Sequence, residues 1–257
     1  MYPFERLNKI MNTLRSKGQI MIEEDAPFFG VSKATLHRDL DQLQQQGLAQ
    51  KVRGGAILRE RRDLESHFHL RLKSQVEEKQ LIAEAAVRSV KDDTSIFLDH
   101  STTALFLAQV LAKRTFKNLI VVTNSLAVPD ALSGMQGIQV ILTGGKVESE
   151  FHALSGRAVI ESFRGFNFHQ VFASCGAVAV GGFMTQASFI YEILSEILNS
   201  PTNSELNILV DSSKFHKIAT FRVGPLKMAT RIYTCGKPPK AFTDKVTALG
   251  VQLVIAQ

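Results

Sequence analysis

Apolar side chains near the start of the chain recur with the spacing of amphipathic helices. Residues 4–17 form one such segment, and Leu36, Leu40 and Leu43 form the apolar stripe of another. Ser32 stands just before that stripe and is a good N-cap, because its hydroxyl can accept a hydrogen bond from an unpaired N–H of the first turn. The pattern therefore predicts two helices, each with one buried face.

Two further segments complete this region. Residues 23–29 predict a second helix, which should be short or begin late because Pro27 disrupts a helix interior. Residues 48–52 and 53–57 predict two short strands joined around a Gly-Gly turn. Three helices and a hairpin together predict a winged helix-turn-helix domain over residues 1–57.

From residue 76 onward, segments of strand length alternate with helical segments. Strands are expected at residues 94–99, 119–123, 138–143, 170–174, 207–210, 232–234 and 251–255. Helices are expected at residues 78–90, 102–112, 126–132, 154–163, 189–198 and 244–249. Near-continuous apolar strands separated by helices are typical of a parallel sheet that is covered on both faces.

The expected fold class is therefore α/β, with an N-terminal winged helix-turn-helix joined to a larger α/β domain that has a mainly parallel sheet. This larger domain should span residues 76–257. Residues 58–75 are rich in charge and lack a clear period, so we interpret them as a linker between the two domains.

Positive charge is concentrated near the predicted winged domain. The chain has a net charge of +6, and residues 32–62 hold seven basic and three acidic side chains. This segment of 31 residues thus carries +4 of the +6. A basic cluster confined to one segment is expected of a module that binds a polyanion.

The segment also places side chains that reach phosphates and base edges at the start of one helix and at the tip of the hairpin. The candidate DNA-binding residues are Ser32, Lys33, Thr35, His37, Arg38, Lys51 and Arg53. A polar outer face on an ordinary helical bundle is the alternative interpretation of the helix alone. The charge distribution favours double-stranded DNA as the partner.

The sequence argues against a membrane, secreted, disulfide-rich or metal-binding protein. No apolar run approaches the roughly 18 residues of a membrane span, and residues 1–18 do not resemble a secretory signal. Two cysteines do not suggest a disulfide framework. His67 and His69 could begin a metal site, but nothing nearby completes one. We expect a cytoplasmic protein with no membrane partner, no metal and no cofactor.

Polar turns follow four of the predicted strands, and ligands of parallel sheets bind beyond the carboxyl ends of strands. The candidate residues in these turns are Asp99, Ser101, Thr102, Thr103, Thr123, Asn124, Gly144, Gly145, Asp211 and Lys214. Hydroxyls and free N–H groups at helix N-termini favour an anion, and Lys214 supplies a positive charge. Any one turn could simply cap a helix. Four together predict a pocket for a small anionic ligand, particularly one that carries a phosphate.

Several of these runs resemble the DeoR family of bacterial transcriptional regulators. The N-terminal runs are Gly30-Val31-Ser32, Thr35-Leu36-His37-Arg38-Asp39-Leu40, Gly47-Leu48 and Gly54-Gly55-Ala56. The four polar turns resemble the sensor domain of that family, which is similar to ribose-5-phosphate isomerases and coenzyme A transferases. The resemblance implies a repressor of a sugar or polyol operon that releases DNA when a phosphorylated sugar binds. It also implies a homo-oligomer, a dimer or tetramer, because a palindromic operator mirrors a two-fold protein axis.

The chain departs from the family pattern at a few positions. His37 stands where the family has the first of two arginines, and Val147-Glu148 stands where the family often has a basic residue. His100-Ser101 replaces a small residue and glycine, and Cys235 replaces a common Asp. A carboxylate at position 148 would weaken an anion site if it faced the pocket. The effector could then be a less charged sugar, or a phosphate that is held differently.

An enzyme is the alternative function. A phosphosugar isomerase-like enzyme with an appended DNA-binding domain would need an acid or base beside the substrate carbon, and Asp99 and Asp211 could serve. The N-terminal domain favours regulation, so we expect no catalytic residues and no enzymatic activity.

Overall fold

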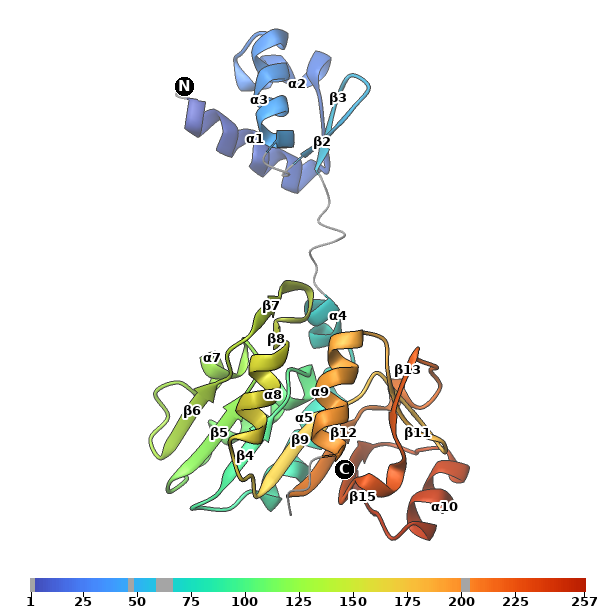
Figure 1. The fold of residues 1–257 in the computed structure, drawn as a ribbon. Coiled ribbons are helices and arrows are strands. Elements are labelled where there is room, and N and C mark those ends of the chain that lie inside the picture. Colours follow the sequence, from blue (N-terminus) through green and yellow to red (C-terminus); the bar gives the residue numbers. More distant parts are fainter. Residues whose placement is uncertain (1–2, 46–48, 59–66, 200–203) are drawn as a thin grey trace. The chain divides into compact units, whose positions relative to one another are not determined.

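The computed structural model describes residues 3–45, 49–58, 67–199 and 204–257 (Figure 1). The chain divides into two compact units, Met1–Glu65 and Ser66–Gln257. Each unit has a hydrophobic core of its own: one cluster in the first unit and two in the second. The two units are therefore described separately.

The N-terminal unit is a winged helix-turn-helix, as predicted. Its elements are α1 (Pro3–Lys17), β1 (Gln19–Met21), α2 (Ile22–Phe29), α3 (Lys33–Gln45), β2 (Ala49–Val52) and β3 (Gly55–Leu58). The strands form an antiparallel sheet in the order β1-β3-β2. Leu36, Leu40 and Leu43 are fully or almost fully buried, which confirms the apolar stripe. Helix α2 is short but begins early, at Ile22, and ends at Phe29, where Gly30 with a φ of 66° caps it.

The C-terminal unit is built on a seven-stranded parallel sheet in the order β15-β14-β12-β9-β4-β5-β6. Its strands are β4 (Ser95–Leu98), β5 (Leu119–Thr123), β6 (Ile138–Leu142), β9 (Gln170–Ser174), β12 (Glu205–Val210), β14 (Arg231–Cys235) and β15 (Gln252–Ala256). All seven predicted strands are present, and the expected parallel α/β fold is confirmed.

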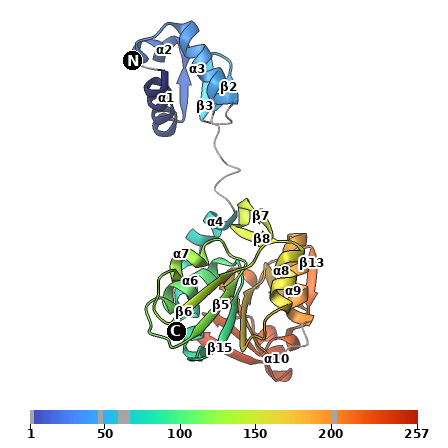
Figure 2. The same cartoon turned by 60° about the vertical axis from the view of Figure 1, so that its left-hand side comes forward.

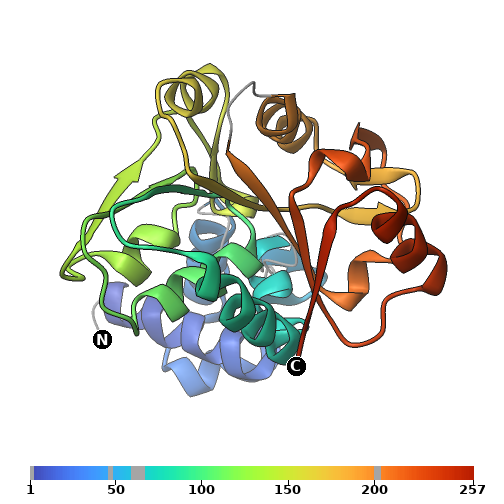
Figure 3. The same cartoon turned by 90° about the horizontal axis from the view of Figure 1, so that it is seen from below.

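Helices cover both faces of this sheet (Figures 2 and 3). They are α5 (Val76–Ala86), α6 (Thr102–Leu111) and α7 (Val128–Leu132) on one face, and α8 (Arg157–Arg164), α9 (Ser188–Asn199) and α10 (Lys240–Ala248) on the other. In β4, Ile96 and Leu98 pack with the first group while Phe97 packs with the second. The alternation follows from the two-residue period of a strand.

Short strands outside the main sheet were not predicted. β7 (Lys146–Glu148) pairs with β8 (Ala153–Ser155), and β11 (Gly182–Thr185) pairs with both β10 (Ala177–Ala179) and β13 (Phe221–Gly224). The helix expected at residues 154–163 begins only at Arg157, because Leu154 belongs to β8. β7 and β8 lack a turn signal such as the Gly-Gly of the wing, whereas the Gly-Gly pair at the turn between β10 and β11 is such a signal and was overlooked.

The expected linker over residues 58–75 is wrong in its second half. Residues 67–73 form helix α4 (His67–Lys73), which belongs to the C-terminal unit, and residues 59–66 lie outside the described residues. Phe68, Leu70 and Leu72 alternate like a strand, which hid the helix from sequence reasoning. In the helix, Phe68 is buried against the core while Leu70 is half exposed.

None of the helices in the described ranges is long and apolar enough to cross a membrane.

Because Phe68 joins the core of the C-terminal unit, a fragment from residue 66 to residue 257 should fold alone. A fragment beginning at residue 77 lacks α4 and loses the burial of Phe68, about 1.5–3 kcal/mol. We expect its midpoint of thermal unfolding to be lower by roughly 3–12 °C. Circular dichroism melts of the two fragments measure the difference, and equal midpoints would contradict the placement of α4 in this unit.

Candidate functional site

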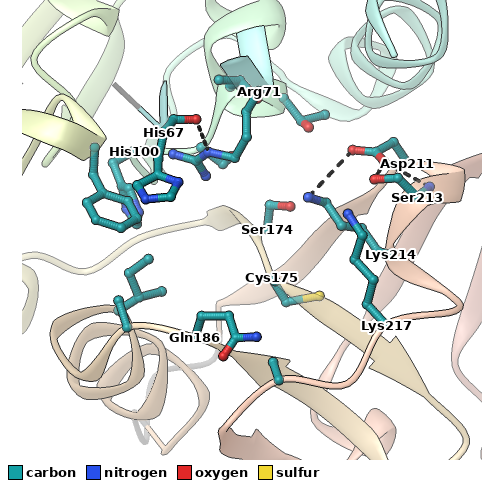
Figure 4. Close-up of a pocket in the computed structure, with 18 of the residues that line it drawn as sticks. His67, Arg71, His100, Ser174, Cys175, Gln186, Asp211, Ser213, Lys214 and Lys217 are labelled. Atoms are coloured by element: carbon teal, nitrogen blue, oxygen red, sulfur yellow. Dashed lines mark hydrogen bonds and ion pairs between the residues drawn. The ribbon is translucent and has the colours of Figure 1, made fainter. Parts of the chain in front are cut away.

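A cavity of about 620 Å³ lies in the C-terminal unit, at the carboxyl ends of β4, β9 and β12 (Figure 4). Its polar lining includes Asp99, Ser101, Thr102 and Thr103 after β4, Ser174 at the end of β9, and Asp211, Ser213 and Lys214 after β12. Helix α4 contributes His67 and Arg71, and Phe151, Ile190 and Ile218 add apolar surface. The volume is that of a small-molecule site.

Asp99 holds two strand ends together beneath this cavity. One carboxylate oxygen accepts a hydrogen bond from the N–H of Ser101 (2.9 Å), and the other accepts one from the N–H of Ser174 (2.8 Å). Burial raises the pKa of the Asp99 carboxyl, and these hydrogen bonds oppose that rise. Ser101 then caps α6, since its hydroxyl accepts from the N–H of Ala104 (3.1 Å). Asp99 and Ser101 thus shape the cavity floor.

Asp211 organises the turn after β12 in a similar way. Its Oδ1 accepts hydrogen bonds from both the N–H and the hydroxyl of Ser213. The Nζ of Lys214 lies 4.0 Å from the other carboxylate oxygen. Burial lowers the pKa of Lys214, while Asp211 opposes the effect. The turn therefore presents one partly offset positive charge to the cavity.

Two further cations come from helices that the sequence analysis did not connect with the pocket. The Nη2 atom of Arg71 in α4 is buried and has no hydrogen-bond partner among the described residues. Lys79 in α5 donates to the carbonyl oxygens of Arg71 and Ser74, and burial lowers its pKa to about 8. The cavity therefore gathers Arg71, Lys79 and Lys214, and no local sequence pattern joins these three positions.

His100 adds a neutral ring. Burial lowers its pKa to about 3, and the nearby positive charge of Arg71 acts in the same direction. Its Nδ1 is buried without a hydrogen-bond partner in the described parts of the chain. A neutral imidazole can exchange a hydrogen bond with a ligand hydroxyl, but it adds no charge to an anion site.

The N-terminal unit presents a second candidate surface. Ser32 caps α3, since its hydroxyl accepts from the N–H of Thr35 (3.2 Å) and also contacts the Thr35 hydroxyl (2.9 Å). Arg38 on α3 and Arg53 at the tip of the wing are exposed. Neither of these two arginines has an ion pair within the described residues.

Carboxylates neutralise the other expected DNA-binding cations. Lys33 pairs with Glu23 of α2. Lys51 of the wing donates to Asp41 of α3 (2.6 Å), and the ring of His37 lies 3.1 Å from the same carboxylate. The hydrogen bond from Lys51 lowers the pKa of Asp41. All of these side chains lie within a single compact unit.

The sequence matches family models along most of its length. Residues 6–62 match the DeoR-like helix-turn-helix domain, and residues 74–234 match the DeoR C terminal sensor domain. The chain belongs to the DeoR family. Its function is accordingly that of a DNA-binding transcriptional regulator, which confirms the resemblance seen in the sequence.

Curated relatives of this DeoR-family chain span its full length. The HTH-type transcriptional regulator GolR of Listeria innocua is 32% identical over 257 residues, 100% of both chains. The glycerol-3-phosphate regulon repressor of Escherichia coli is 27% identical and covers 97% of each chain. The HTH-type transcriptional repressor GlcR of Bacillus subtilis is 28% identical, covering 100% of this chain and 98% of its own.

Among solved structures, ribose 5-phosphate isomerase A of Methanocaldococcus jannaschii aligns with 55% of this DeoR-family chain and 55% of its own. The two are 17% identical, with a TM-score of 0.39. A score this low supports no conclusion about shared activity.

Four residues that we expected in the effector pocket of this DeoR-family chain do not line it. Thr123 donates to the carbonyl oxygen of Leu98 (2.7 Å), and Asn124 donates to that of Leu154 (3.0 Å). Gly144 and Gly145 lie against α8 and β8, where a Cβ on Gly145 would stand 2.5 Å from the carbonyl oxygen of Ser155. These turns follow β5 and β6, which lie on the other side of β4 from the cavity. Asn124 and Gly145 contact β8 there, through Leu154 and Ser155.

Glu148 also lies outside the residues that line the cavity. It accepts a hydrogen bond from the hydroxyl of Ser155 (2.7 Å) and pairs with Lys146 (3.1 Å). The departure from the DeoR family pattern at this position therefore brings no carboxylate to the pocket, and the reason for expecting a less charged effector disappears.

The low pKa of His100 gives a direct test of the pocket electrostatics. We expect the ring to stay neutral between pH 8 and pH 5, because its pKa of about 3 lies below that range. ¹⁵N chemical shifts of the His100 ring, assigned with a His100→Gln variant, measure its protonation. A titration midpoint above pH 5 would contradict the buried, cation-facing environment.

Proposed function

We propose that this DeoR-family chain represses a sugar- or polyol-utilisation operon and releases its operator when a phosphorylated sugar or polyol occupies the cavity. Relatives of the same length are named repressors, and one is named for a glycerol-3-phosphate regulon. The carrying observation is a set of three cations around a cavity lined with hydroxyls: Lys79 is buried, and Arg71 and Lys214 are partly buried.

A phosphorylated polyol suits both parts of this lining. Buried cations are costly without a counter-charge, so an anion that reaches Arg71 and Lys214 is stabilised there. The hydroxyls of Thr102, Thr103 and Ser174 offer partners to the hydroxyls of a sugar. The cations of the lining outnumber its two carboxylates, Asp99 and Asp211, so a neutral sugar would leave positive charge without a counter-charge, which is why we favour a phosphorylated effector.

The hydrogen bonds of Asp99 and Asp211 favour a binding role for these carboxylates over a catalytic one. An isomerase base must be free to take a proton from the substrate carbon. Both oxygens of Asp99 already accept backbone N–H groups, and Oδ1 of Asp211 accepts two bonds from Ser213. These bonds support a role in shaping a binding site, so we propose that the chain is not an enzyme.

Double-stranded operator DNA is the proposed partner of the N-terminal unit. The basic face of α3 would enter the major groove, where Arg38, with His37, Lys33 and Thr35 beside it, would approach base edges. Lys51 and Arg53 would contact phosphates from the wing. We propose that the chain acts as a homo-oligomer in the cytoplasm, since a two-fold operator requires two such units.

A thermal-shift screen tests the proposed effector class. Glycerol 3-phosphate, ribose 5-phosphate and other phosphorylated polyols should stabilise the purified chain, while their unphosphorylated forms should not. Lys214→Met should weaken the binding of active compounds by roughly 10- to 150-fold, as expected for the loss of one charge-assisted hydrogen bond. Lys146→Met removes the same charge outside the cavity and serves as the control. Equal binding by the Lys214 variant would place the anion elsewhere.

The DNA-binding face is tested by separate substitutions of Arg38 and Arg53. Arg38→Ala should cost about 1–3 kcal/mol on the operator and relax specificity, as loss of a base contact does. Arg53→Ala should weaken binding to all duplexes and reduce the salt slope by about 1, as loss of a phosphate contact does. Fluorescence anisotropy against salt concentration measures both effects. Arg114→Ala in the other unit is the control, and parental affinity in both variants would refute the assignment.

A further inference from the structure

Helix α4 has a special place in the chain. It begins at His67, two positions after the N-terminal unit ends at Glu65. It is also part of the cavity wall, because His67 and Arg71 both line the cavity. One short helix therefore both contacts the candidate effector site and is the first described element after the DNA-binding unit.

The guanidinium group of Arg71 is incompletely paired. Its Nε donates to the carbonyl oxygen of His67 (3.0 Å), within the same helix, and its Cζ atom lies 5.7 Å from the centre of the Phe151 ring. Nη2 is buried with no hydrogen-bond partner in the described ranges. Arginine keeps its charge in proteins, so this donor cannot escape the cost of burial by losing a proton. An acceptor in the cavity would satisfy it.

Like charges face one another across the cavity. In Figure 4, Arg71 lies on the opposite side of the cavity from Lys214 and Lys217. Burial is the main cause of the lowered pKa values of Lys79 and Lys214 and Asp211 opposes it, while the positive charge of Arg71 lowers both values further, as repulsion between cations does. Asp99 and Asp211 already attract Arg71, and an anion bound between the cations would add attraction on both sides and draw α4 toward the turn after β12.

A few tertiary contacts hold α4 against the rest of the C-terminal unit. The helix has seven residues, too few to be stable without tertiary contacts. The ring of Phe68 stacks on His152 with centroids 4.7 Å apart, and His67 stacks on Phe151 at 5.6 Å. Lys79 holds the carbonyl oxygens of Arg71 and Ser74 at the end of the helix. An ion pair between Arg71 and a bound anion would add to these contacts and hold α4 more firmly.

We propose that Arg71 binds the anionic group of the effector, and that the order of α4 reports occupancy of the cavity to the DNA-binding unit. This inference rests on the proposed function, in which the effector is phosphorylated. A ligand shifts an equilibrium only through its different affinity for two states. Here the two states are α4 docked over the cavity with Arg71 on the anion, and α4 loosely held.

Hydrogen exchange of the full chain tests the inference, with glycerol 3-phosphate and inorganic phosphate as probes. In the parent, the probes should slow exchange of the amides of residues 67–73 by about tenfold or more, and leave those of α10 unchanged. Arg71→Met keeps most of the side-chain length and removes the charge. It should bind the probes roughly 10- to 150-fold more weakly and show no added protection of α4 even at saturation.

Two substitutions of Leu70, to glycine and to alanine, test the stability of α4 without changing the cavity lining. The Leu70 side chain is half exposed and does not line the cavity. Leu70→Gly should reduce the effect of the probe on operator affinity by about fivefold, because glycine disfavours a helix. Leu70→Ala should retain the full effect. The DNA is a duplex selected from a random pool by the full chain. Equal responses from the two variants would overturn the role of α4.

The outcomes also separate the inference from the function on which it rests. If Arg71→Met binds the probes and protects α4 as the parent does, while Lys214→Met does not, the inference falls and the phosphorylated effector stands. If neither probe binds the parent or changes exchange in residues 67–73, the proposed effector class and the role of Arg71 both fall.

Discussion

The structure of the C-terminal unit depends on the two hydrogen bonds that Asp99 accepts at the centre of the sheet. One ties the carboxylate to the N–H of Ser101, and the other to the N–H of Ser174 at the end of β9. The first shapes the turn that places the Ser101 cap on α6, and the second joins the ends of β4 and β9. Without a buried acceptor there, two backbone donors would lose their partners. These two hydrogen bonds thus shape the part of the cavity lined by Asp99, Ser101 and Ser174.

Much of the fold was predictable because its main strands are apolar and alternate with helices along the chain. Every strand of the seven-stranded sheet is marked by an apolar segment, and the leucine stripe of α3 marks the winged unit. The elements that were missed are short. β7 has only three residues. Helix α4 was missed because its apolar residues Phe68, Leu70 and Leu72 alternate as in a strand. Such elements form because tertiary contacts hold them, and local sequence does not record those contacts.

The site was predictable only in part, because the strand order decides which turns meet. After β4 the chain builds β5 and β6 on one side, and β9 and β12 then continue on the other. The cavity lies at that reversal, where ligands of open parallel sheets bind. Asp99, Asp211 and Lys214 follow strands on the correct side, whereas Thr123 and Gly144 follow strands on the other. Arg71, which comes from a helix far from those strands in sequence, gives no local signal of its role.

Both units hold cations that are partly offset by nearby carboxylates before any partner arrives. In the winged unit, Asp41 contacts Lys51, and Glu23 pairs with Lys33. In the sensor unit, Asp211 lies 4.0 Å from Lys214. In the proposed complexes, a phosphate must replace these internal partners, so each cation contributes less to affinity than a free one would. Because the charge of a ligand then adds little to its affinity, the site favours ligands whose other groups also fit the cavity. Asp99 and Asp211 also attract Arg71, but its buried Nη2 has no hydrogen-bond partner among the described residues, so an incoming anion adds a hydrogen bond there without replacing one.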